Sequence, residues 1–289
     1  MHGMADVLYP PSRPQSVGEI LDSAFRIFGV TLLSCLPYAA LAAIISQLPS
    51  LHNGMTADSF TVASLLALWS RRVQDPLWWV VFAVSVCGSL TLTNAVTRRQ
   101  YALMTGRRPA TRDELAIGAR RFPGVLLIVV LLSLPFVGSY LSALAVLLVG
   151  PSSLLITIGL LILGSWLGVR WLCSWVIYLV TDRGVLASLS HSWFLTAGNV
   201  WRMSLICTVG LAMILVVSAL APVLGGMASL LFARGDFATA AVATTVVATL
   251  LQILIAPFYS ALSLAMFGDL SVRREGIDLA QRISAPAIQ

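Results

Sequence analysis

Charge is scarce in this sequence, and one charged residue type is missing altogether. Of 289 residues only 10% are charged, lysine does not occur, and all 18 basic side chains are arginines. A soluble domain carries about a quarter charged residues, so this composition, with 58% hydrophobic residues, excludes an ordinary soluble domain. It favours an integral membrane protein with several spans. We expect the net charge of +6 to set the orientation of the spans and to contact anionic lipid headgroups, and we expect no nucleic-acid partner.

The side chains that carry most catalytic and metal chemistry are also rare. The chain has three histidines, and it contains no HExxH, GxSxG or P-loop motif. Four cysteines lie singly in apolar runs without a CxxC pair, so we expect buried small side chains rather than disulfides or metal ligands: Cys35, Cys87, Cys173 and Cys207. We therefore expect no catalytic residues, no metal and no cofactor, and a protein that is not an enzyme.

Uncharged apolar stretches predict six membrane-spanning helices. A span needs about 20 apolar residues. Stretches of that length place the helices near 29–50, 77–99, 123–148, 153–180, 203–224 and 239–268. The expected fold class is an all-α integral membrane protein with six transmembrane helices.

The distribution of arginines predicts the orientation of these spans. An even number of spans puts both termini on one side, and fourteen arginines fall on that side. Only Arg71, Arg72 and Arg234 fall on the other side, and Arg170 lies within a span. This bias predicts that both termini are cytoplasmic. The N-terminus lacks the apolar core of a signal peptide, so we expect residues 1–15 to remain as an irregular, proline-containing arm.

Two similar segments suggest an internal repeat. Ser16–Glu19 and Thr111–Glu114 both have the spacing of a capping box, in which a hydroxyl and a glutamate satisfy the first N–H groups of a helix. A third, weaker copy has Gly184 at the expected cap. We expect one membrane domain over 16–280, with repeats at about 16–108, 109–182 and 183–280, followed by a tail at 281–289.

Each repeat is expected to begin with a short amphipathic helix that precedes a pair of spans. Such helices lie in the headgroup plane with arginines on the wet side; the alternative is that they pack under the bundle. The first reading predicts contacts with anionic phospholipid at the inner leaflet for Arg26, Arg120, Arg121 and Arg202.

Three polar side chains fall within apolar segments: Asn94, Arg170 and Gln252. Polar residues inside spans are either helix-packing partners or parts of a polar site. Arg170 lies about 25 Å along its predicted helix, so we favour an arginine that extends to the inner interface. The apolar residues 171–180 would then lie beyond the membrane and need cover from other segments.

Three stretches carry a family resemblance: R-P-Q-S-V-G-E-I-L-D-S-A-F-R-I-F at 13–28, A-S-L-S-H-S-W-F-L-T-A-G-N-V-W-R at 187–202, and D-L-S-V-R-R-E-G-I-D-L at 269–279. Together they resemble the membrane domain associated with glycerophosphoryl diester phosphodiesterases. That resemblance implies a six-span module of the bacterial cytoplasmic (inner) membrane, without the phosphodiesterase barrel. The residues that match its motifs are Asp182, Ser192, Trp193, Asp269, Arg273, Arg274, Glu275 and Asp278. Gly268 stands where the family has a tyrosine.

Two functions follow as hypotheses. The first is a non-enzymatic scaffold, or a subunit of a membrane complex with a membrane-protein partner, that contacts anionic phospholipid of the bilayer. The alternative is a transporter or lipid flippase with a polar site between the helices, built from Asn94, Arg170 and Gln252.

Overall fold

The structure is a computed structural model that describes residues 9–53, 74–108, 110–150, 153–232 and 237–276. These residues form helices and no strands. The helices are α1 (Val17–Ser46), α2 (Leu48–Asn53), α4 (Pro76–Met104), α5 (Thr111–Val149), α6 (Ser153–Arg170), α7 (Ser174–Val180), α8 (Val185–Thr196), α9 (Val200–Phe232) and α10 (Phe237–Glu275).

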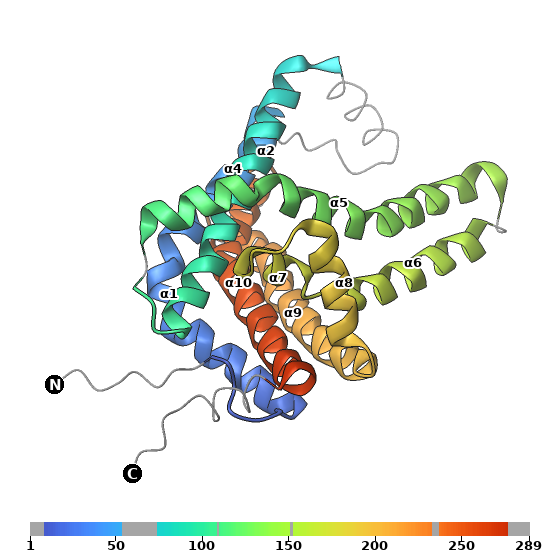
Figure 1. Ribbon diagram of the computed structural model, residues 1–289. Helices are drawn as coiled ribbons and strands as arrows, with labels where there is room; N and C mark the ends of the chain where they lie inside the picture. The colour runs from blue at the N-terminus through green and yellow to red at the C-terminus, as the bar shows by residue number, and fades with distance from the viewer. Residues whose placement is uncertain (1–8, 54–73, 109, 151–152, 233–236, 277–289) are drawn as a thin grey trace, which may run out of the picture.

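Six helical segments are long and apolar enough to cross a membrane. They correspond to α1, α4, α5, α6 with α7, α9 and α10, so the chain is a multi-pass membrane protein. Helix α10 packs between α1 and α9, and α1 packs against α4 (Figure 1). The order of the spans along the chain agrees with the prediction.

The expectation of separate amphipathic helices before the first two pairs of spans is wrong. Residues 16–28 are not a separate element, because α1 runs without a break from Val17 to Ser46. Its first turns bury Ile20, Ala24 and Ile27, which recur at helical spacing and pack in the core. Likewise α5 runs from Thr111 to Val149. In the third repeat alone, α8 is a separate short helix before a span. The repeat itself stays a prediction.

The two predicted capping boxes behave differently. At Ser16 the box is confirmed: the Ser16 N–H donates to Glu19 Oε2 (2.6 Å), and the Glu19 N–H donates to Ser16 Oγ (3.3 Å). At Thr111 it is wrong, because the Glu114 N–H donates to the Ala110 carbonyl (3.0 Å). The Glu114 side chain is buried and points elsewhere.

The predicted helix at 153–180 is two helices. A turn at residues 171–173 separates α6 from α7. The expectation that residues 171–180 need cover is met inside the bundle, where Cys173, Val176 and Ile177 are fully buried. Their neighbours come from α4, α5, α8 and α10.

Helices α5 and α6 form a hairpin that extends away from the other helices (Figure 1, green). Only 6% of the apolar stretch containing α6 is buried within the protein, compared with 56% for α10. The hairpin therefore presents most of its apolar surface outward.

Candidate functional site

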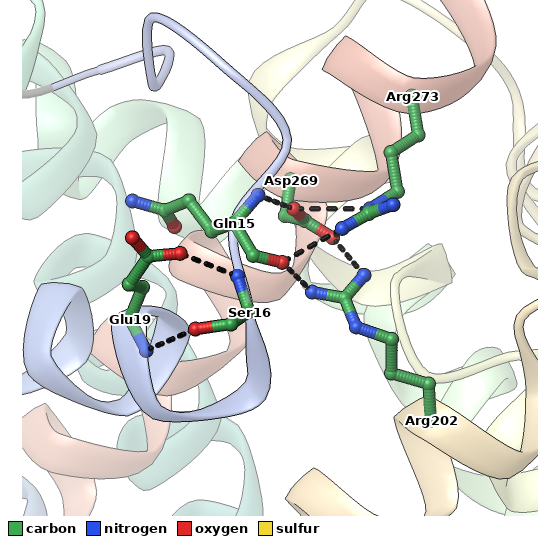
Figure 2. A network of polar contacts seen from close by, with 6 residues as sticks. All are labelled: Gln15, Ser16, Glu19, Arg202, Asp269 and Arg273. Carbon is green, nitrogen blue, oxygen red and sulfur yellow. Dashed lines mark hydrogen bonds and ion pairs between the residues drawn. The ribbon is translucent and has the colours of Figure 1, made fainter.

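A fully buried carboxylate joins three distant parts of the chain. Asp269 of α10 has no exposed surface and accepts hydrogen bonds from the Gln15 N–H (2.7 Å) and Arg202 Nη1 (2.8 Å). Arg273 Nε lies 3.0 Å from the same carboxylate (Figure 2). Both arginines also donate to the Gln15 carbonyl. This Asp269 cluster, made of Gln15, Arg202, Asp269 and Arg273, fixes the start of α1 and the start of α9 to the end of α10.

The residues before α1 pack against the same end of α10. Tyr9 is buried between Tyr101 and Phe267, with ring centroids at 5.5 and 6.4 Å. Burial raises the pKa of Tyr9 well above its usual value. A Cβ atom on Gly268 would lie 2.8 Å from the Tyr9 ring, so any other residue there would require this ring to shift.

A second buried carboxylate, Glu114, connects α5 to α1 and α4. Its Oε2 accepts a hydrogen bond from the Tyr38 hydroxyl (3.0 Å) and lies 3.6 Å from Arg99 Nη1. The Arg99 guanidinium also lies over the Tyr38 ring, 5.3 Å from its centroid. Sequence reasoning assigned Glu114 to a capping box and missed this contact, because Tyr38 is 76 residues away.

Four arginines line a cavity of about 420 Å³ where α4 ends, α5 begins and α7 leads into α8. We call it the arginine pocket, and its lining is Arg98, Ile117, Arg120, Arg121, Tyr178, Asp182, Arg183 and Gly184. Four guanidinium groups and one carboxylate leave an excess of three positive charges in the wall.

Two of these arginines are fixed by the end of α7. Arg98 Nη1 donates to the Leu179 carbonyl (2.7 Å), and Arg121 donates to the carbonyls of Tyr178 and Thr181. Helix ends leave such carbonyls without partners, so the arginines satisfy them. Arg121 Nη2 also pairs with Asp182 Oδ1 at 2.7 Å.

The other two arginines of the pocket have no such partner. Arg120 and Arg183 are exposed, and no ion pair or hydrogen bond joins either side chain to the rest of the described chain. The pocket therefore combines two positioned guanidinium groups with two that remain available to an anion.

The predicted polar set within the spans is not brought together. Asn94 Nδ2 donates to the Gly118 carbonyl (3.3 Å), and its Oδ1 accepts from Trp175 Nε1 (3.2 Å), so it links α4 to α5 and α7. Gln252 Oε1 lies 3.5 Å from Ser46 Oγ, between α10 and α1. These contacts hold helices against one another.

Arg170 lies at the end of α6, against α8. Its guanidinium is held by two tryptophan rings, with centroids 4.2 Å away for Trp193 and 5.7 Å away for Trp166. The Ser192 hydroxyl donates to the Arg170 carbonyl at 2.9 Å. The motif residues Ser192 and Trp193 therefore attach α8 to α6.

The four arginines predicted to contact lipid divide into two pairs. Arg26 and Arg120 are exposed. Arg121 and Arg202 instead point inward, to the end of α7 and to Asp269, with about four fifths of each side chain covered. The local sequence did not show these partners, because they lie 57 and 67 residues away along the chain from Arg121 and Arg202.

Two further motif residues, Arg274 and Glu275, lie near α8. Arg274 donates to the Ala197 carbonyl and lies over the Phe194 ring at 5.7 Å. Glu275 Oε1 is 3.1 Å from His191 Nε2. Asp278 lies outside the described residues.

The four cysteines are free thiols. Cys35 and Cys173 are buried and Cys207 is partly buried, but Cys87 is exposed on α4, so the expectation of burial is wrong for it. Within the described ranges, no group of three or more histidine, cysteine, aspartate or glutamate side chains could hold a metal ion.

Comparisons with family models, curated proteins and solved structures found no match to this chain. The family resemblance of the motif segments therefore stays a prediction.

Proposed function

We propose that this multi-pass membrane protein is a non-enzymatic binding protein that holds anionic phospholipid at the cytoplasmic leaflet. The observation that carries the proposal is the arginine pocket, with its excess of three positive charges. Guanidinium groups bind phosphate oxygens in pairs of hydrogen bonds, and arginine is the residue best suited to this. The pocket lies where α4 ends and α5 begins, so the adjacent apolar helices would place it at headgroup depth.

Lipid analysis of the purified protein tests this proposal. Arg120→Gln and Arg183→Gln each remove a charge from the pocket without breaking a described contact, so each should reduce the anionic phospholipid that copurifies. Arg112→Gln removes the same charge from an exposed position in the first turn of α5, outside the pocket lining, and should leave the lipid content unchanged. Native mass spectrometry of the three variants gives the measurement. Equal lipid content in all three and in the unchanged protein would contradict the proposal.

The exposed α5–α6 hairpin supports a second role as a subunit of a membrane complex. Its apolar residues face outward on a segment that is hardly buried, and such faces fit another apolar helix as well as lipid. A photoreactive amino acid in place of Leu155 on α6 should crosslink to a protein in native membranes. The same probe in place of Leu33 on α1 is the control, because Leu155 and Leu33 are similarly exposed, at 76% and 82%. Crosslinks to lipid alone at both positions would contradict the subunit role.

The transporter hypothesis receives no such support. It requires Asn94, Arg170 and Gln252 to share one site, but their contacts lie with different helices: Trp175 and Gly118 for the first, α8 for the second and α1 for the third.

A further inference from the structure

The arginine pocket contains more positive charge than an ordinary phospholipid headgroup requires. A phosphodiester carries one negative charge, and the pocket wall has an excess of three positive charges. A phosphomonoester carries about −1.5 to −2 at neutral pH and presents three acceptor oxygens. We infer that the pocket binds a phosphomonoester group, an inference that rests on the proposed function and narrows its ligand.

Two arginines give the pocket a preformed side. Arg98 and Arg121 are held by the carbonyls at the end of α7, so their guanidinium groups lose little freedom when an anion binds. Arg120 and Arg183, which have no partner among the described residues, can then close on the remaining oxygens. The fixed pair sets the position of the phosphate, and the free pair supplies the additional charge.

The start of α8 adds hydrogen-bond donors at the same wall. Gly184, which lines the pocket, is the N-cap of α8 and offers no side chain to cap it. The first backbone hydrogen bond of this helix runs from the Ser188 N–H to the Gly184 carbonyl (2.9 Å). The N–H groups of residues 185–187 come before that bond and therefore have no carbonyl of the same helix to donate to. Within the described chain these three N–H groups have no acceptor. At α1, by contrast, Ser16 and Glu19 form a complete cap.

The size of the cavity agrees with this ligand class. At about 420 Å³ it lies within the range of small-molecule sites, which is roughly 300–1,000 Å³. A phosphate alone fills a small part of that volume. There is space for the phosphate and for part of the group that carries it, which is either a lipid backbone or a soluble molecule.

Binding of short-chain lipids to the full-length protein in detergent tests the inference. The probes are dihexanoyl phosphatidic acid, a phosphomonoester, and dihexanoyl phosphatidylglycerol, a phosphodiester, each with inorganic phosphate as competitor. We expect the monoester to bind at least about tenfold more tightly, because one further charge-assisted hydrogen bond is worth at least that factor. Equal affinity for the two lipids would overturn the monoester inference and leave the proposed lipid-binding function standing.

Inorganic phosphate separates the two sources of the ligand. Competition by phosphate together with binding of the monoester lipid supports both proposals. Binding of phosphate without either lipid supports a phosphomonoester site for a soluble ligand and overturns the lipid function. Binding of none of the three probes overturns both.

Substitution of Gly184 isolates the contribution of α8. Gly184→Asp should cap the helix with its own carboxylate, maintain thermal stability and weaken binding of the monoester at least tenfold, because the carboxylate occupies the N–H groups and repels the phosphate. Ser190→Asp is the matched control: it adds the same carboxylate at an exposed position of α8 outside the pocket lining, and binding should be unchanged. Unchanged binding in a folded Gly184→Asp variant would overturn the part assigned to α8.

Discussion

Loss of Asp269 should disturb the end of the bundle where α1 and α9 begin and α10 ends. Its carboxylate is fully buried and is shared by Arg202 and Arg273, whose side chains are 19% and 30% exposed. Asp269→Asn would leave both guanidinium groups without a counter-charge, and removal of one partner from a buried ion pair costs about 3–5 kcal/mol. Partial exposure of the arginines places the expected loss near the lower end, at about 3 kcal/mol.

Thermal unfolding in detergent provides the measurement for Asp269→Asn. The control is Asp22→Asn on α1, where the carboxylate is exposed and makes no ion pair with the rest of the described chain. Its melting temperature should stay that of the unchanged protein. If the Asp269→Asn variant melts at the same temperature as the unchanged protein, the Asp269 cluster adds nothing to stability.

His191 should make stability depend on pH. Burial and the nearby Arg183 lower the pKa of His191, while Glu275 opposes them. In the unfolded chain the histidine has a pKa of about 6.5. Because its pKa is lower in the folded state, a falling pH protonates His191 in the unfolded chain before it does so in the folded protein. The free energy of unfolding should therefore be highest above that pH and should fall as the pH drops below it. Melting curves between pH 8 and 5.5 should show this decline, and His191→Gln should weaken it; an equal decline in both would assign it to other groups.

At the scale of elements, the contact between α9 and α10 depends on Gly225. A Cβ there would lie 2.5 Å from the Cα and 2.6 Å from the N of Thr244, and backbone atoms cannot move aside as a flexible side chain can. Gly225→Ala should separate the two helices locally and cost about 1–3 kcal/mol, the usual cost of overpacking. Gly226→Ala is the adjacent control, because a Cβ there meets nothing within 4 Å. Comparison of the two melting temperatures tests the contact; equal values would contradict it.

The sequence predicted elements that depend on chain-local physics and missed those that depend on distant partners. The spans follow from the length of apolar chain that a bilayer requires, and the Ser16 cap from hydroxyl and carboxylate groups three residues apart. The cap expected at Thr111 fails because Tyr38 and Arg99 bind Glu114 instead. The turn at 171–173 has no glycine or proline to reveal it.

The candidate site was predicted only in part, for the same reason. Arg120 and Arg121 were singled out as basic residues at a membrane boundary, but Arg98 and Gly184 join them through contacts between helices that sequence spacing does not reveal. The absence of a cap at Gly184 was visible in the sequence as a departure from the repeat. Its role in the pocket became visible only in the structure, which places the start of α8 beside the arginines.

At the scale of the whole molecule, orientation determines which leaflet faces the arginine pocket. The pocket lies on the same side as Arg108, in the connection between α4 and α5. Fourteen of 18 arginines fall on that side and three on the other, a bias that predicts a cytoplasmic position for the pocket. A reporter that is active only outside the cytoplasm should work when fused near Asp58, a position outside the described residues, and should be inactive near Arg108. The reverse pattern would turn the pocket toward the outer leaflet, and the proposed binding of cytoplasmic-leaflet lipid would then be wrong even if the pocket binds phosphate.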